Sequence, residues 1–470
     1  DYETIGAMSE LITTGPPARR RALSPRATVI LTASIAALGG LLFGYDTSVI
    51  SGAMLFFSHT FHLTTVQLEW AVSAVLLGAM AGSALGGRMT DLWGRRWVLL
   101  ATGAGFGVFS VWTGLSSGLA TFVVARFLVG CCIGVASLVT PLYISEMAPA
   151  KIRGGLVSLN QLAITVGIGI AYIVDYSLAG SKNWRLMFIS AVIPAVLLVI
   201  GMMFLPESPR WLAKGGRLRE ALANFQRLGR EREAQAELAD VERVLREETG
   251  KFWDLFKPGV RMAVWIGIGL AILQQITGIN TIIYYAPDIL TRAGYASAKA
   301  AILATAIIGV VNILTTVLAI FLVDWVGRKP LLIVGSAGMA ASLAFVGYSF
   351  SQQAKGVGVF VGVLVYIFFF AVSLGPVVWL MIAEIYPTKI RGSAMSLATF
   401  FNWLANFVVA VSFLSLLKAV GTVHTFWIFA GLSILCLLFC WLVIPETKGK
   451  SLEAIEESFR RLGRRSKAPA

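Results

Sequence analysis

Runs of about 20 apolar residues, separated by short polar or charged pieces, recur along nearly the whole chain. An α-helix of that length crosses the ~30 Å hydrocarbon core of a bilayer. The sequence predicts twelve such spans, at residues 27–57, 66–87, 97–115, 120–143, 156–178, 185–205, 260–288, 300–323, 330–350, 357–382, 392–417 and 424–444. Charged residues make up 14% of the 470, against about 25% in an ordinary soluble protein. We therefore expect an all-α membrane protein, and the alternating strands of a membrane barrel are excluded.

Three segments lie outside these spans. Residues 1–26, rich in Gly, Pro and Arg, are expected to be a disordered tail, and residues 445–470 a cytoplasmic tail. Residues 206–256 form the one large polar interruption, in which Leu218, Leu222 and Phe225 follow helical spacing. This pattern predicts a helical linker on the inner membrane surface, between an N-terminal bundle at 27–205 and a C-terminal bundle at 257–444.

Basic residues predict the orientation of the chain. With a cytoplasmic N-terminus, 32 of the 39 Lys and Arg residues fall on the cytoplasmic side, six fall at outer ends and Arg126 falls inside a span. Because Lys and Arg are enriched in cytoplasmic loops, both termini are expected inside. The net charge of +14 then reflects topology and attraction to anionic lipid, and no nucleic-acid partner is implied.

The two halves of the chain repeat one another. ISEMAPAKIRG at 144–154 recurs as IAEIYPTKIRG at 382–392, DLWGRR at 91–96 recurs as DWVGRK at 324–329, and LPESPR at 205–210 is echoed by IPETKG at 444–449. Parallel repeats of six spans are typical of transporters whose binding site lies between the halves.

Asp46 and Arg126 are the two ionisable residues expected well inside spans, and a charge at that depth indicates function. The first span runs outward and the fourth runs inward, so both residues fall in the outer half and can pair. A conformational change that altered this pairing would load and release a proton. A static buried ion pair is the alternative.

A set of uncharged polar and aromatic residues also lies inside apolar spans. Amides offer both donors and acceptors, as a neutral, hydroxyl-rich ligand requires, and Trp379 could face the apolar side of a sugar ring. Gly278, between Gln274 and Asn280, would let a helix or a ligand approach. Hydrogen bonds between helices are the competing interpretation. The set is Gln161, Gln274, Gln275, Asn280, Tyr284, Asn312, Trp379, Asn402, Trp403 and Asn406.

Two further groups are candidates for gating. Gly375 and Pro376 lie inside the tenth span, where proline predicts a kink that serves either as a hinge or as a static bend. Charged residues at matching cytoplasmic helix ends could form ion pairs that close the inner face, although topology alone would explain the basic ones. These residues are Asp91, Arg95, Arg96, Glu146, Arg153, Asp324, Arg328, Lys329, Glu384 and Arg391.

Several signals of other functions are missing. There is no complete phosphate-binding GxxxxGK[ST] motif, and the three histidines, His59, His62 and His424, are too few and too scattered for a metal site. No nucleophile, base and acid set is recognisable, and the four cysteines lie in apolar runs as free thiols. We expect no enzyme activity, no cofactor and no metal.

The motifs resemble the sugar porter family of the major facilitator superfamily, and specifically its bacterial proton-coupled hexose and pentose symporters. The resemblance covers about residues 28–457 and rests on GGLLFGYDTSVISGA, DLWGRR, PLYISEMAPAKIRG, PESPRWL, QQITGINTIIYYAP, DWVGRKP, GPVVWLMIAEIYPTKIRG and PETKGKSLE. It implies twelve helices in two six-helix halves and a helical linker that latches the inner gate.

By the same resemblance, Asp46 would accept the proton with Arg126 as its partner, since family facilitators usually carry Asn at that position. The implied sugar contacts are Gln161, Gln274, Gln275, Asn280 and Trp379, with Phe43, Tyr284, Asn312 and Asn402 lining the site. Asn402 departs from relatives that carry Gln, so the sugar that is bound stays open.

The expected function is proton-driven import of a monosaccharide, such as a hexose or a pentose, by a monomer in the bacterial inner membrane. The alternatives within transport are a passive sugar facilitator and a proton-coupled polyol or inositol symporter. A nutrient sensor is disfavoured by the short C-terminal tail, and an enzyme of lipid-linked sugars by the absence of an acid and base set.

Overall fold

The computed structural model describes residues 24–149, 152–228, 252–257, 260–352, 356–386 and 390–448. This part of the chain is almost entirely helical and contains no strand. The disordered character expected of residues 1–26 concerns a segment that lies, except for residues 24–26, outside the described residues. The same holds for most of the C-terminal tail.

Seven helices form the first half of the chain. They are α2 (Pro25–Thr60), α3 (Thr65–Trp93), α4 (Arg95–Leu115), α5 (Leu119–Met147), α6 (Arg153–Ala179), α7 (Trp184–Ile189) and α8 (Val192–Phe204). The predicted sixth span corresponds to α7 and α8 together. It is interrupted at Ser190 because Pro194, four residues later, has no N–H to bond the Ser190 carbonyl.

The second half contains α12 (Arg261–Ile276), α13 (Ile279–Arg292), α14 (Ala298–Val326), α15 (Arg328–Ser351), α16 (Val357–Val372), α17 (Leu374–Ile385) and α18 (Arg391–Leu442). Gly278 separates α12 from α13 with a φ of +93°, a left-handed conformation that glycine adopts readily. Gly421, with φ 80° and ψ 161°, divides α18 into two helices. These two helices are the eleventh and twelfth predicted spans, so the twelve-span architecture is confirmed.

The polar linker folds against the first half. Its described helices are α9 (Pro209–Lys214), α10 (Leu218–Arg227) and the 3₁₀ turn η1 (Phe252–Phe256). Phe225 and Ala221 of α10 pack on Leu212 and Ala213 of α9, which confirms the predicted helical stripe for this stretch. Residues 229–251 of the predicted linker lie outside the described residues.

The sequence repeat has a structural counterpart at two helix N-termini. Glu207, from LPESPR, accepts hydrogen bonds from the backbone N–H groups of Arg95 and Arg96 at the start of α4, at 3.0–3.2 Å. Glu446, from IPETKG, accepts from Arg328 and Lys329 at the start of α15, at 3.1 and 3.0 Å. A carboxylate at a helix N-terminus satisfies free N–H groups and complements the helix dipole.

A glycine at each of these N-termini makes room for the carboxylate. Gly94 and Gly327 precede the two helices with φ of +88° and +106°, and a Cβ on either would meet the carboxyl group of Glu207 or Glu446. The two caps differ in electrostatics. Burial raises the pKa of Glu207 despite its backbone hydrogen bonds. Partial burial of Glu446 also acts to raise its pKa, but the N–H groups of residues 448, 328 and 329 outweigh it and lower the pKa.

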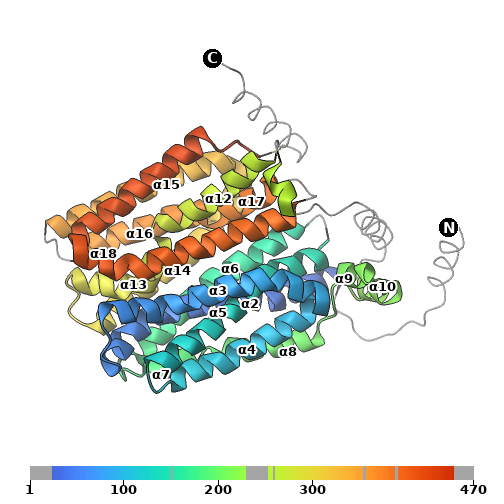
Figure 1. The fold of residues 1–470 in the computed structure, drawn as a ribbon, viewed down its shortest axis with the longest axis horizontal. Helices are drawn as coiled ribbons and strands as arrows, with labels where there is room; N and C mark the ends of the chain where they lie inside the picture. Colours follow the sequence, from blue (N-terminus) through green and yellow to red (C-terminus); the bar gives the residue numbers. More distant parts are fainter. Residues whose placement is uncertain are drawn as a thin grey trace, which may run out of the picture.

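The two halves lie side by side, with α3 packed along α18, α6 along α14 and α2 along α13 (Figure 1). The end of the bundle that carries α9 and α10 is called the linker end here, and the other end the opposite end. Inside the first half, α3 and α5 touch backbone to backbone. A Cβ on Gly78 or Gly130 would overlap carbonyl oxygens of the facing helix, so this half is held as a tight unit.

Hydrogen bonds between the halves gather at the opposite end. Glu69, near the start of α3, accepts from the Ser415 backbone N–H and hydroxyl of α18, both at 2.6 Å. The Tyr172 hydroxyl of α6 donates to the Ile283 carbonyl of α13 at 3.0 Å. Among the described residues these are the hydrogen bonds that cross from one half to the other. The structure therefore has the halves joined at the opposite end.

Candidate functional site

An ion pair is buried inside the first half. Arg126 of α5 donates from Nη1 to Oδ1 of Asp46 in α2 at 2.5 Å, and the side chains are 0% and 3% exposed. The guanidinium also lies over the Phe188 ring, 5.4 Å from its centroid. Asp46 Oδ2 and Arg126 Nη2 have no hydrogen-bond partner in the described residues. Such a pair holds one charge against the other while leaving a carboxylate oxygen free to take a proton.

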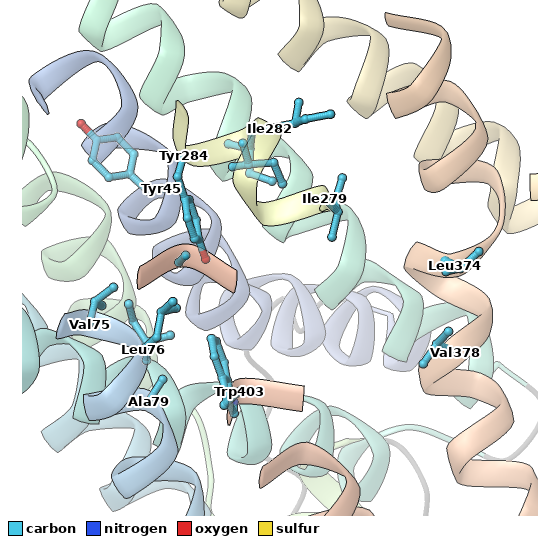
Figure 2. Close-up of a cluster of buried hydrophobic side chains, with 14 of the residues drawn as sticks. Tyr45, Val75, Leu76, Ala79, Ile279, Ile282, Tyr284, Leu374, Val378 and Trp403 are labelled. Atoms are coloured by element: carbon cyan, nitrogen blue, oxygen red, sulfur yellow. The ribbon is translucent and has the colours of Figure 1, made fainter. Parts of the chain in front are cut away.

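Tyr284 of α13 brings the second half to this ion pair. Its ring is buried, it lies within electrostatic reach of both Asp46 and Arg126, and its hydroxyl accepts from the Asn406 amide of α18 at 3.2 Å. Figure 2 shows Tyr284 and Trp403 of the second half in one buried cluster with Val75 and Leu76 of the first. A change at the ion pair is therefore adjacent to the boundary between the halves.

Four amides of the second half form one hydrogen-bonded network. Asn402 donates to the Gln274 Oε1 atom at 2.9 Å and to the Ala271 carbonyl at 2.9 Å. Gln275 donates to Asn402 Oδ1 at 3.0 Å and accepts from Asn280 at 2.7 Å. Gln274 in turn donates to the Leu374 carbonyl at 2.8 Å. The break at Gly278 brings Asn280 of α13 back to Gln275 of α12, so the spacing of the motif serves the network.

Aromatic rings connect the network to the ion pair. Phe43, one turn before Asp46 on α2, lies 5.3 Å from the Trp403 ring, centroid to centroid, and Trp403 directly follows Asn402. Gln161 of α6 and Trp379 of α17 are half-buried, and Asn312 of α14 is buried. Their polar atoms have no printed contact with the network, so the structure brings together Gln274, Gln275, Asn280 and Asn402 but leaves these three beside it.

The expectation that Asp46 and Arg126 are the two ionisable residues deep in spans is wrong. Glu69 of α3 and Asp175 of α6 are 1% and 0% exposed. The sequence interpretation missed them because both lie within about a turn of a predicted span end, where a carboxylate is ordinarily wet. The helices α3 and α6 extend to or beyond those predicted ends and the packing of neighbouring helices covers both side chains.

The charged residues at the linker end pair within each half. In the first half Arg95 contacts Glu146 at 3.0 Å and Asp91 at 3.5 Å, and Asp91 also contacts Lys214 of α9 at 3.4 Å. Arg96 donates to the Met202 and Met203 carbonyls at 3.1 and 2.8 Å. These contacts tie α3, α4 and α5 to the linker.

The second half repeats this arrangement. Arg328 donates to Glu384 at 2.9 Å, and Glu384 accepts from the Thr447 hydroxyl at 2.6 Å. Arg153 of the first half donates to the Ala148 carbonyl at 3.4 Å. The side chains of Asp324 and Arg391 lie outside the described residues. Among the described ion pairs none crosses between the halves, so any gating by these residues acts through the shape of each half.

The kink expected at Gly375 and Pro376 lies slightly earlier. Helix α16 ends at Val372 and α17 begins at Leu374, with Ser373 in a non-helical conformation (φ −129°, ψ −92°). Pro376 removes one backbone donor and its ring crowds the carbonyl of residue 372, so the break falls one turn before the proline. Pro376 thus sits in the first turn of α17, where proline is tolerated.

A separate cavity of about 350 Å³ lies between the halves at the opposite end, with Met54, His59, Asp288 and Lys418 among its lining residues. Lys418 is 16 residues beyond Asn402, about 24 Å of helix, so this cavity is distinct from the amide network. Within the described residues no cluster of His, Cys, Asp and Glu could hold a metal ion.

Comparisons with known proteins agree with the architecture. The family model described as "Sugar (and other) transporter" matches residues 32–459. The arabinose-proton symporter of Bacillus subtilis is 39% identical, covering 91% of this chain and 94% of that protein. The galactose-proton symporter of Escherichia coli is 38% identical, covering 94% and 97%.

A solved structure shows the same fold. The xylose transporter XylE of E. coli, in a partially occluded inward-open conformation, superposes with a TM-score of 0.81 at 35% identity, covering 90% of this chain and 100% of that one. The full-length match of the family model, the identity to these relatives and the shared fold lead to one conclusion. The chain belongs to the sugar transporter family, within the major facilitator superfamily.

Proposed function

We propose that this protein imports a monosaccharide into the cytoplasm together with protons, by alternating access. The observation that carries the proposal is the placement of a buried carboxylate and its cation, Asp46 and Arg126, in one half, facing a buried amide network in the other. The similar proteins named as proton symporters of arabinose and galactose support it. Members of this family are transporters, so the chain is not an enzyme.

Asp46 is suited to carry the proton. Its Oδ1 atom is held by Arg126 and its Oδ2 atom is without a partner. Protonation at Oδ2 neutralises the carboxylate and removes most of its attraction to Arg126. Since Arg126 then lacks its counter-charge inside the bundle, the protonated state favours a different packing of α2, α5 and Tyr284. That coupling lets the proton bias the conformation in which sugar binds.

The amide network is suited to hold a sugar. A monosaccharide presents several hydroxyl groups, each a donor and an acceptor, and Gln274, Gln275, Asn280 and Asn402 offer both kinds of atom. Trp379, Trp403 and Phe43 supply flat apolar surface for the C–H face of the ring. The position of this site between the halves is the one expected for a carrier built from two repeats.

The membrane placement follows the basic residues. We propose that the linker end faces the cytoplasm of a bacterium, with both termini inside, that the protein works as a monomer in the inner membrane, and that the opposite end faces outward. Cysteine-accessibility labelling from the outside tests this orientation. A reporter cysteine in the exposed turn at Gly118 should react with a membrane-impermeant maleimide, and one at Lys214 should react only after the cells are made permeable.

Proteoliposomes test the activity. Glucose, galactose, xylose, arabinose and inositol are added in turn to a lightly buffered, de-energised suspension, and external pH is recorded. Alkalinisation with one or two of them establishes symport and identifies the substrate. Sugar exchange without a pH change would replace symport by facilitation, and alkalinisation with inositol alone would establish a polyol symporter.

The variant Asp46→Asn separates coupling from transport. It keeps the size of the side chain and removes the proton-accepting carboxylate, so uphill accumulation should fall to the passive level while exchange of labelled sugar survives. Asn224→Ala, which removes an amide bonded to the Glu207 carbonyl in the linker region, is the control and should keep accumulation. Full accumulation by Asp46→Asn would contradict the assignment.

A further inference from the structure

Asp175 is a second buried carboxyl that the mechanism above does not use. It lies on α6, four residues before the helix ends at Ala179, and its side chain is 0% exposed. Its Oδ2 atom accepts a hydrogen bond from the Gly52 backbone N–H at 3.0 Å, and its Oδ1 atom has no partner. No Lys or Arg of the described residues lies within ion-pair distance of it.

The cations on the helices packed around Asp175 are engaged elsewhere. Arg126 of α5 pairs with Asp46, and Arg185 of α7 donates to the Gly114 and Ser116 carbonyls at 2.8 Å each. Lys299 of α14 lies over the Tyr176 ring at 5.3 Å, and on α13 Arg292 pairs with Asp288 at 2.7 Å. On α3, Glu69 is bound to Ser415.

The remaining titratable neighbours are neutral hydroxyls and thiols. They are Tyr45 on α2, Tyr172 on α6, Tyr284 and Tyr285 on α13, and Cys131 and Cys132 on α5. An ionised carboxylate in a dry site with a single backbone donor and no cation is strongly unfavourable. The closed arrangement therefore holds Asp175 as the neutral acid, which carries a proton.

The cover over this part of α6 comes from the other half. Tyr172, one turn from Asp175 on the same helix, donates to the Ile283 carbonyl of α13, and its ring lies against Gly309 of α14. Separation of the halves at the opposite end would break this contact and admit water beside Asp175. The closeness of Asp175 to α2 depends on Gly52, because a Cβ there would lie 2.5 Å from the carboxyl oxygen.

A path toward Asp46 runs along α2. Gly52 is six residues from Asp46, about 9 Å of helix. The hydroxyls of Ser48 and Ser51 are buried without partners in the described residues, and the Tyr45 hydroxyl lies near both carboxyl groups and bonds Ser190 at 2.6 Å. Hydroxyls and transient water at such spacing can pass a proton between two carboxyl groups.

We propose that Asp175 is the proton-entry residue for Asp46: it takes a proton from the outer solution when the halves open at the opposite end, and passes it inward to the Asp46 carboxylate. One proton leaves water for Asp175 and the same proton then leaves Asp175 for Asp46, so no other reactant is needed. This inference rests on the proposed proton-coupled import.

Asp175→Asn is the test variant. Its amide oxygen can still accept from Gly52, so the fold is retained, but it cannot exchange a proton. Proton-driven uptake should slow about tenfold at external pH 8, where protons are scarce, and much less at pH 5.5, while sugar exchange stays within about twofold of the parent. Asp175→Glu, which exchanges protons but is bulkier, should recover the uptake at pH 8.

The outcomes separate the roles. A purely structural acid would tolerate the isosteric Asn better than the bulkier Glu, so uptake at pH 8 in the order Asn above Glu overturns the proposal. So does a pH profile of Asp175→Asn that superimposes on that of the parent. Asp46→Asn, run in parallel, loses coupling at every pH if the function proposal holds, and a parent without coupling refutes that proposal alone.

A measurement without substrate tests Asp175 in either case. The infrared C=O band of a protonated carboxyl should be present in the parent at pH 7 and lost in Asp175→Asn, because Asp46 is ionised against Arg126. If the Asn variant does not insert into the membrane, the band should shift in Asp175→Glu. A band unchanged in these variants overturns the inference.

Discussion

Asn402 has the most fully used side chain of the amide network, with two donated hydrogen bonds and one accepted. Truncation in Asn402→Ala leaves Gln274 Oε1 and the Gln275 amide short of a partner, at about 1–3 kcal/mol for a buried group. We expect at least a tenfold rise in KM for sugar uptake, with an unchanged ratio of protons to sugar in the residual transport. A KM within twofold of the parent, measured beside the Asn224→Ala control, would place the sugar elsewhere.

Single residues also mark the reach of sequence reasoning. The pairing of Asp46 with Arg126 follows from the directions and depths of their spans, and the amides stand out because polar groups are rare in apolar runs. Glu69 and Asp175 do not, since helix ends are predictable only to a few residues and the covering side chains come from sequence-distant helices. That Gln161 and Asn312 stand apart from the network depends on helix rotation, which a sequence does not contain.

At the scale of helices, the contact of α3 with α5 depends on glycine. A Cβ at Gly130 would overlap the Val75 carbonyl, whereas one at Gly431 of α18 would meet nothing within 4 Å. We therefore expect Gly130→Ala to separate the two helices, lowering the thermal-unfolding temperature in detergent and the yield of folded protein. Gly431→Ala is the matched control and should change neither, and equal behaviour of the two variants would refute the backbone contact.

The repeated helix caps predict a difference in pH dependence. The lowered pKa of Glu446 means that its folded-state charge stabilises the fold above pH 4.5, and that this contribution is lost as the pH falls through the folded-state pKa. The raised pKa of Glu207 gives the reverse sign, because its contribution is present at low pH and lost as the pH rises through its folded-state value. Near neutral pH, Glu446→Gln should cost on the order of 0.3–1 kcal/mol, and Glu207→Gln less.

Unfolding temperatures of both variants from pH 7.5 down to 4 check this sign. The deficit of Glu446→Gln relative to the parent should shrink below pH 4.5, and a deficit that grows there would contradict the assignment. The helix positions and the repeat that supplies these caps were predictable from the sequence. The break at Ser373 instead of Pro376 was not, because the proline acts on a carbonyl a full turn earlier.

At the scale of the whole molecule, Glu69 and Ser415 join the halves at the opposite end. Removing them in Glu69→Ala or Ser415→Ala eliminates charge-assisted hydrogen bonds worth roughly 1.5–3 kcal/mol each, so the population open at that end should rise about tenfold or more. A reporter cysteine at Ile283, buried at the boundary of the halves, should then react faster with maleimide from the outside.

Ser412→Ala provides the matched control for this measurement. Its hydroxyl bonds carbonyls of its own helix, Val408 and Val409, and contributes nothing between the halves. Its labelling rate should equal that of the parent. A Glu69→Ala rate no faster than the Ser412→Ala rate would show that the halves are held closed by apolar packing alone.

The hydrogen bonds among Gln274, Gln275, Asn280 and Asn402 have a consequence for the return stroke of the carrier. A transporter must pass through an occluded state twice per cycle, once loaded and once empty, and an empty polar site sealed from water would strand its donors and acceptors. Here the side chains bond one another when no sugar is present, so the empty passage leaves few of them unsatisfied. A carrier built in this way resets without cargo, which is the step that lets a symporter turn over when the cytoplasm holds little sugar to carry back.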